Sequence, residues 1–167
     1  MRKLLILGML ALELAVCGCG NSTNTNTTPP TTAASGKWQA VMVGGHGQSG
    51  VLDFVTEFSV DSGGGPLTIT ALSFLTTQAC FVTNETASGS AVLTTSNTNQ
   101  VTGTLSFTIN SGSPAGNQLV LNGTTLTGTS NNGTLSGGLV TGVWTLTGGE
   151  GDSTCTGTGT FTLTQSS

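Results

Sequence analysis

Charged side chains are scarce in this sequence. They make up 6% of the 167 residues, with three Lys or Arg residues and seven Asp or Glu residues. A protein that binds nucleic acid needs several basic side chains against the phosphates, and electrostatic attachment to anionic lipid needs a similar cluster. We therefore expect no nucleic-acid partner and no purely electrostatic hold on a membrane.

Histidine and tyrosine are scarce as well, since the chain has one histidine, His46, and no tyrosine. A Ser-His-acid triad needs a positioned nucleophile, and no Gly-x-Ser-x-Gly elbow occurs. Gly45–Gly50 matches the Gly-x-Gly-x-x-Gly phosphate-binding pattern, but neither a helical pattern nor an acidic residue about 20 positions further on follows it. We expect no enzymatic activity, no cofactor, and a solvated turn residue at His46.

Glu150 and Asp152 are the acids best placed for chemistry, because the glycines around them allow a tight turn. Such a turn can gather carboxylate and carbonyl oxygens around a calcium ion, and glycosidases use a pair of acids roughly 5–9.5 Å apart. Nothing in the sequence places these two acids in a cleft. We expect no metal site and interpret both as solubilising turn residues, with a metal-binding or enzymatic role as the alternative.

The first 18 residues have the composition of an export signal. Arg2 and Lys3 precede an apolar run, Leu4–Val16, that is shorter than the roughly 20 residues of a membrane-spanning helix. The end of this run resembles the lipobox of bacterial lipoproteins, in which a small residue precedes a cysteine that is acylated and becomes the first residue. Gly18 before Cys19 matches that pattern better than Val16 before Cys17.

The lipobox resemblance implies lipidation of Cys19, with Cys17 as the alternative cysteine and a plain signal peptide as the alternative leader. Glu13 departs from the pattern, because a carboxylate lies inside the apolar run. Several acyl chains, at about 0.8 kcal/mol per buried methylene, form an effectively permanent anchor. The residue after Cys19 is Gly20 and not an aspartate. This resembles the pattern of lipoproteins that are sorted to the outer membrane of the bacterial cell envelope.

Composition divides the chain into three parts: a signal peptide at 1–18, a lipidated cysteine and tether at 19–35, and one domain at 36–167. The tether is rich in Thr, Asn and Pro and has almost no apolar content, so we expect it to be disordered, with a reach on the order of 20 Å. Cleavage before Cys19 leaves 149 residues, enough for one domain with a core. After cleavage, the one positive charge of Lys37 and the six negative charges of the carboxylates give the mature chain a net charge of −5.

Apolar residues recur at every second position through most of residues 36–167, which is typical of strands with one buried face. The pattern predicts strands at 36–43, 51–60, 67–76, 89–95, 100–109, 118–126, 139–147 and 154–165, with a possible further strand at 80–82. A helix is the alternative for 51–60, but its β-branched residues favour a strand. Asn132-Gly133 suits a type I′ hairpin turn.

These strands predict an all-β antiparallel meander of about eight or nine strands, closed as a small barrel, with a two-sheet sandwich as the alternative. A short motif, in which glycine precedes an aromatic residue by a few positions among alternating threonines, recurs at 101–109, 140–146 and 156–163. Its uneven spacing disfavours a β-solenoid. Glycine inside a strand usually marks a bend or a close backbone approach, and we expect the threonines on the solvated face.

Gly36-Lys37-Trp38 resembles the Gly-x-Trp that opens the first strand of lipocalin-type barrels, where the tryptophan plugs one end of the barrel. A core tryptophan of any β fold is the alternative interpretation. The resemblance implies a second candidate function, in which the barrel carries an apolar small molecule in its interior.

Cys80 and Cys155 remain in the predicted domain. A pair of cysteines in an exported protein most simply forms a disulfide, with two free buried thiols as the alternative. Together these observations predict a monomeric, lipid-anchored envelope protein that has a binding or structural role and no catalytic activity. Its partner is an envelope component or a small molecule that the sequence does not identify.

Overall fold

The structure is a computed structural model that describes residues 30–44, 52–149 and 154–166. It consists of nine antiparallel strands joined by turns and loops, which confirms the all-β prediction. The strands are β1 (Ala34–Val43), β2 (Phe54–Val60), β3 (Gly64–Pro66), β4 (Thr68–Phe74), β5 (Thr86–Thr95), β6 (Gln100–Asn110), β7 (Gln118–Asn131), β8 (Thr134–Thr147) and β9 (Gly157–Gln165). The described residues form no helix long and apolar enough to cross a membrane.

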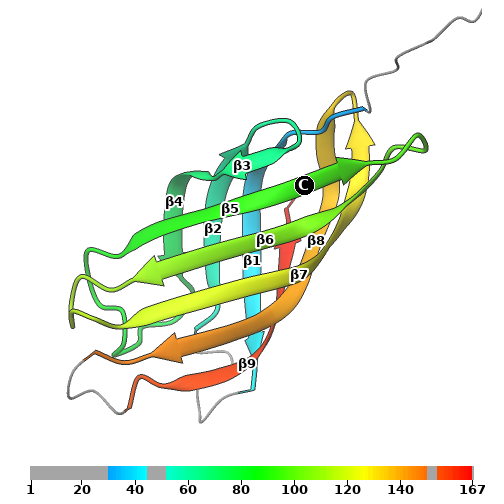
Figure 1. The fold of residues 1–167 in the computed structure, drawn as a ribbon. Helices are drawn as coiled ribbons and strands as arrows, with labels where there is room; N and C mark the ends of the chain where they lie inside the picture. Colours follow the sequence, from blue (N-terminus) through cyan, green and yellow to red (C-terminus); the bar gives the residue numbers. More distant parts are fainter. Residues whose placement is uncertain (1–29, 45–51, 150–153, 167) are drawn as a thin grey trace, which may run out of the picture.

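The strands form one sheet in the order β3-β5-β6-β7-β8-β9-β1-β2-β4. Its two edge strands, β3 and β4, are successive parts of one segment and are separated only by Leu67. The first part pairs with β5 and the second pairs with β2, so the sheet curls into a nearly closed barrel (Figure 1). From β5 to β9 each strand pairs with the next strand in the sequence, and β1 pairs with both β9 and β2, so the predicted meander is confirmed as a nearly closed barrel.

The interior of the barrel is filled by large side chains from neighbouring and from opposite strands. Trp38 stacks on Phe58 with ring centroids 5.1 Å apart, and Phe54 stacks on Phe107 at 5.7 Å. Trp144 is fully buried and donates its indole N–H to the carbonyl of Val43 at 3.2 Å. Alternation of apolar and polar residues puts these side chains inside because successive residues of a strand face opposite sides of the sheet.

The outer wall of β5 to β9 carries mainly hydroxyl and amide groups, with exposed apolar side chains at Val92, Leu139 and Val143, and no charge. Residues 86–149 and 154–166, which contain all five strands, include no Asp, Glu, Lys, Arg or His. On β9, Thr158, Thr160 and Thr164 are exposed, while Phe161 and Leu163 between them are buried. The predicted threonine-covered outer face is therefore confirmed for this strand.

Glycines of the repeated motif lie where the backbones of two strands approach too closely for a side chain to fit between them. A Cβ at Gly103 would lie 1.9 Å from the Val92 carbonyl oxygen, and one at Gly142 would lie 2.0 Å from that of Asn122. The ladders of β6 with β7 and of β7 with β8 shift register nearby. These close approaches let the wall bend around the core, as expected for glycine within strands.

Several boundaries differ from the sequence-based predictions. The strand predicted to begin at Gly36 begins at Ala34, because Thr32 and Ala34 are already buried against the barrel. The expected turn at 61–66 contains the short strand β3, and β5 begins at Thr86. The stretch 51–60 forms a strand, β2. The predicted hairpin turn is confirmed, since Asn132 and Gly133 have φ values of 50° and 78° between β7 and β8.

The close approach at Gly142 makes a direct stability prediction. Gly142→Ala should lower the free energy of unfolding by about 1–3 kcal/mol, because the new methyl group must push the β7 backbone away. Ser136→Ala, at an exposed position of the same strand, is the matched control and should change the stability little. Chemical denaturation followed by tryptophan fluorescence measures both. Equal stability of Gly142→Ala and wild type would contradict the described packing of β7 against β8.

Candidate functional site

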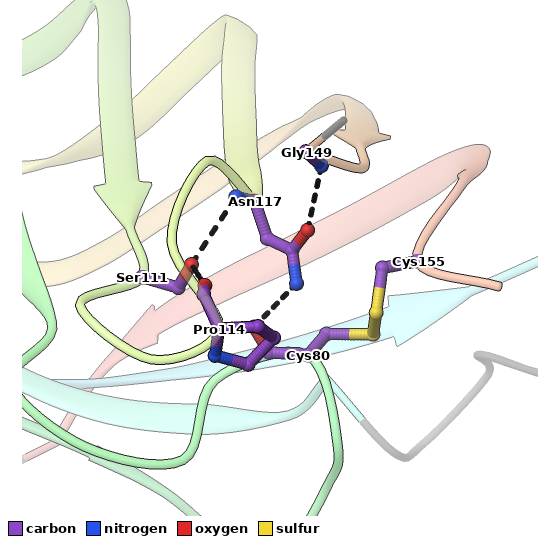
Figure 2. The surroundings of a disulfide bond; sticks show 6 residues. All are labelled: Cys80, Ser111, Pro114, Asn117, Gly149 and Cys155. Carbon is purple, nitrogen blue, oxygen red and sulfur yellow. Dashed lines mark hydrogen bonds between the residues drawn. A yellow bond between two sulfur atoms is a disulfide. The ribbon is translucent and has the colours of Figure 1, made fainter. Parts of the chain in front are cut away.

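One end of the barrel is closed by a disulfide between Cys80 and Cys155. Their Cα atoms are 5.6 Å apart, and both residues are buried. Figure 2 shows the bond between the two residues. Cys80 lies in the loop between β4 and β5, whereas Cys155 lies just before β9, which is several strands away from both β4 and β5 in the sheet. The predicted disulfide is confirmed, and we refer to this end as the disulfide end.

Asn117 holds the loops of the disulfide end together. Its side-chain amide donates to the Cys80 carbonyl at 2.9 Å, and its side-chain oxygen accepts from the Gly149 amide at 2.8 Å. Its own backbone amide donates to the Ser111 hydroxyl, which in turn donates to the Pro114 carbonyl (Figure 2). Because Asn117 is 1% exposed, these bonds satisfy polar groups that water does not reach. Three loops of the barrel end are thereby fixed relative to one another.

The opposite end is bound to the N-terminal segment, and we call it the tether end. Thr32 is fully buried there and donates its hydroxyl to Ser130 at 2.7 Å, while the Thr95 hydroxyl donates to Thr32 at 2.8 Å. The Ala33 amide donates to the Gly133 carbonyl at the tip of the β7–β8 hairpin. The chain therefore enters the barrel at the end remote from the disulfide.

A groove runs along the wall between β4 and β5. The Leu67 amide donates to the Gly89 carbonyl at 2.9 Å, and this bond marks the closed end of the groove. Beyond it, among the described strands, β4 is an edge strand that pairs with β2 alone, and the first residues of β5 pair with β6 alone. The two strands therefore separate toward the disulfide end.

Two adjoining depressions make up this groove. The larger, about 390 Å³, is lined by Leu72–Gln78, Phe81, Val82 and Glu85. The smaller, about 230 Å³, is lined by Ile69–Leu72, Glu85 and Ala87. Leu72 and Glu85 border both depressions, so the hollow is continuous along the open part of β4.

Apolar side chains line the groove beside a few polar ones. The rings of Phe74 and Phe81 stack with centroids 5.1 Å apart. Ile69, Leu72 and Phe74 pack against the core but are only partly buried, unlike their counterparts elsewhere in the barrel. Glu85 is half-buried and is the charged residue of the lining. The groove thus offers apolar contact with one negative charge at its border.

Gln78 gives the larger depression its most unusual polar group. The residue is 8% exposed, and neither the nitrogen nor the oxygen of its side-chain amide has a hydrogen-bond partner among the described residues. A buried amide without partners costs about 1–3 kcal/mol. Such a group therefore calls for a ligand or ordered water that supplies both a donor and an acceptor.

The other residues that the sequence singled out for chemistry fall mostly in stretches that the structure does not describe. Cys17, Cys19, His46, Glu150 and Asp152 are outside the described residues. Within the described part of the chain, no three His, Cys, Asp or Glu residues are grouped so that they could hold a metal ion. The Asp53 carboxylate has a structural contact, since it accepts the Met42 backbone amide at 2.7 Å.

The groove itself was not anticipated from the sequence. Its apolar residues follow ordinary strand alternation, and its polar residue Gln78 stands in a loop with no distinctive motif. Comparison with protein-family models, with curated proteins and with solved structures found no match. The site is therefore argued from its own geometry.

The disulfide makes a quantitative prediction for the stability of the barrel. Replacing both Cys80 and Cys155 by alanine should lower the free energy of unfolding by about 4 kcal/mol in the chain-entropy model, because the bond spans a separation of 75 residues. Denaturant titration with and without a reductant measures the effect. Reductant should destabilise the wild type and leave the double variant unchanged, whereas a wild type insensitive to reduction would contradict the prediction.

Proposed function

We propose that this chain is a lipid-anchored protein of the bacterial cell envelope, with a non-catalytic binding role carried by the groove between β4 and β5. The anchor is inferred from the leader and from Cys19, with Cys17 as the alternative. The scarcity of histidine and of acidic residues in the sequence supports a binding role over an enzymatic one. The proposed destination is the outer membrane, following Gly20.

The observation that carries the proposal is the placement of the groove relative to the point where the chain enters. Thr32 and Ala33 are fixed at the tether end. The larger depression lies beside the loop that contains Cys80, at the disulfide end. An anchor on Cys19 would therefore leave the wide end of the groove facing away from the membrane and accessible to a partner. Figure 1 shows the start of β1 and the β4–β5 loop at opposite ends of the strands.

The filled interior favours binding at the wall of the barrel over carriage inside it. Trp38, Phe54 and Phe107 are each no more than 1% exposed and lie in the space where a lipocalin-type barrel would hold its ligand. Admitting an apolar ligand there would require several close-packed aromatic rings to move. The lipocalin-like alternative therefore receives no support from the packing, and the burial of Trp38 is equally expected of a core tryptophan in any β fold.

Metabolic labelling tests the anchor. The full chain is expressed in a bacterial host supplied with an alkyne-bearing fatty acid, and the label on the purified protein is measured by gel fluorescence and mass spectrometry. We expect labelling of the wild type, complete loss in Cys19→Ser, and retention in Cys17→Ser. The labelled protein should partition into the membrane fraction, because several acyl chains hold a protein there permanently.

The paired cysteine variants keep this experiment decisive. Loss of label in Cys17→Ser with retention in Cys19→Ser would move the anchor to the alternative cysteine. A wild type that is exported but carries no label would refute the lipoprotein assignment. Hydrolysis of an ester or glycoside by the purified chain that disappears in Glu150→Gln or Asp152→Asn would refute the non-catalytic role.

A further inference from the structure

The groove has the properties of a site that accepts an added β-strand. We propose that it binds an extended peptide with alternating apolar side chains and a basic residue, which pairs its main chain with the free edge of β4. The inference rests on the proposed function and names the class of partner that the groove would take. Three independent observations support it.

The first observation is the unpaired edge. Over Ile69–Phe74, no strand of the described structure pairs with β4 on the side that faces β5. An unpaired edge presents a row of main-chain donors and acceptors, and proteins usually cover such a row or blunt it with charge or proline. β4 contains neither charge nor proline within its bounds. At ~3.3 Å per residue, its free part matches a peptide of about six residues.

The second observation is the Gln78 amide. Its nitrogen and oxygen are buried in the wall of the larger depression without partners among the described residues. A side-chain amide has donors on its nitrogen and an acceptor on its oxygen. A peptide group in the groove would supply the matching acceptor and donor. Gln78 lies just beyond the end of β4, where an added strand would extend past Phe74.

The third observation is the chemistry along the groove. Ile69, Leu72 and Phe74 remain partly exposed although they pack against the core, so every second side chain of an added strand would find apolar surface. Glu85 borders both depressions, and no described Lys or Arg lines either of them. This charge favours a Lys or Arg on the peptide and disfavours an acidic one.

Peptide titration tests the proposal on the isotope-labelled chain, purified in full from membranes in detergent. The probe is the acetylated, amidated hexapeptide Val-Thr-Val-Lys-Val-Thr. One control carries Glu in place of Lys, and a second carries N-methyl groups on alternate residues, which remove main-chain donors. We expect amide shifts confined to Ile69–Phe74, Thr86–Ser88 and the Gln78 side chain. The glutamate peptide should bind about tenfold more weakly, and the N-methylated peptide should not bind measurably.

Variants of Gln78 separate binding from folding. Gln78→Leu should weaken peptide binding by about tenfold while stability is kept or raised, because the substitution removes an unpartnered buried amide. Gln100→Leu, on β6 and exposed, is the matched control and should bind the peptide as the wild type does. Glu85→Gln should abolish the preference for lysine over glutamate.

Other results would overturn the proposal. Equal binding of the N-methylated peptide would show that the main chain is not recognised. No binding, together with a Gln78→Leu variant that is less stable, would assign the amide to ordered water. Shifts that appear with protein concentration alone would assign the β4 edge to a second copy. None of these results bears on lipidation of Cys19, so the labelling experiment tests the anchor separately.

Discussion

The hydrogen bond from the Leu67 amide to the Gly89 carbonyl sits where one segment of chain changes its partner. Before Leu67 the segment pairs with β5, and after it the segment pairs with β2. This exchange brings the two edges of the sheet together and encloses the aromatic core. It also leaves the far part of β4 without a second neighbour among the strands that the structure describes. Closure of the barrel and opening of the groove therefore have the same structural cause.

The residues just before Leu67 suit the change of pairing partner from β5 to β2. Gly63, Gly64 and Gly65 have φ values of 86°, 105° and 142°, which residues with a side chain rarely adopt. A Cβ at Gly64 would also lie 2.3 Å from the Ala91 carbonyl oxygen, so glycine allows β3 to approach β5. Pro66 has no amide to donate, which suits a strand of only three residues at the edge of the sheet.

The two ends of the barrel are stabilised by different means. Covalent and buried polar contacts at Cys80 and Asn117 fix the disulfide end. The hydroxyls of Thr32, Thr95 and Ser130 fix the tether end. Under the proposed anchoring, the hydroxyl-lined end faces the membrane and the covalently bridged end faces the partner. A groove whose floor includes the loop of Cys80 is then held in shape before any ligand arrives.

The alternation of apolar and polar residues, together with the compartment proposed from the leader, accounts for what could be predicted from the sequence. Trp38, Phe107 and Phe161 each lie between two polar residues in a stretch where apolar residues recur at every second position, so their burial and the β class follow directly. The pairing of Cys80 with Cys155 was predicted because the leader resembles an export signal. The groove could not be predicted in this way, because it depends on which neighbour each part of 64–74 chooses. The roles of Gln78 and Asn117 could not be predicted either, because they depend on loops that the fold brings together from distant parts of the chain.

Amide hydrogen exchange tests the partial closure of the barrel most directly. The account predicts a protected Leu67 amide and an alternating pattern along Ile69–Phe74, in which amides that face β2 exchange slowly and amides that face β5 exchange fast. The corresponding amides of β6 and β7, paired on both sides, should be protected throughout. Uniform protection along β4 would show a fully closed wall with no groove. A rapidly exchanging Leu67 amide would show that the sheet does not close there.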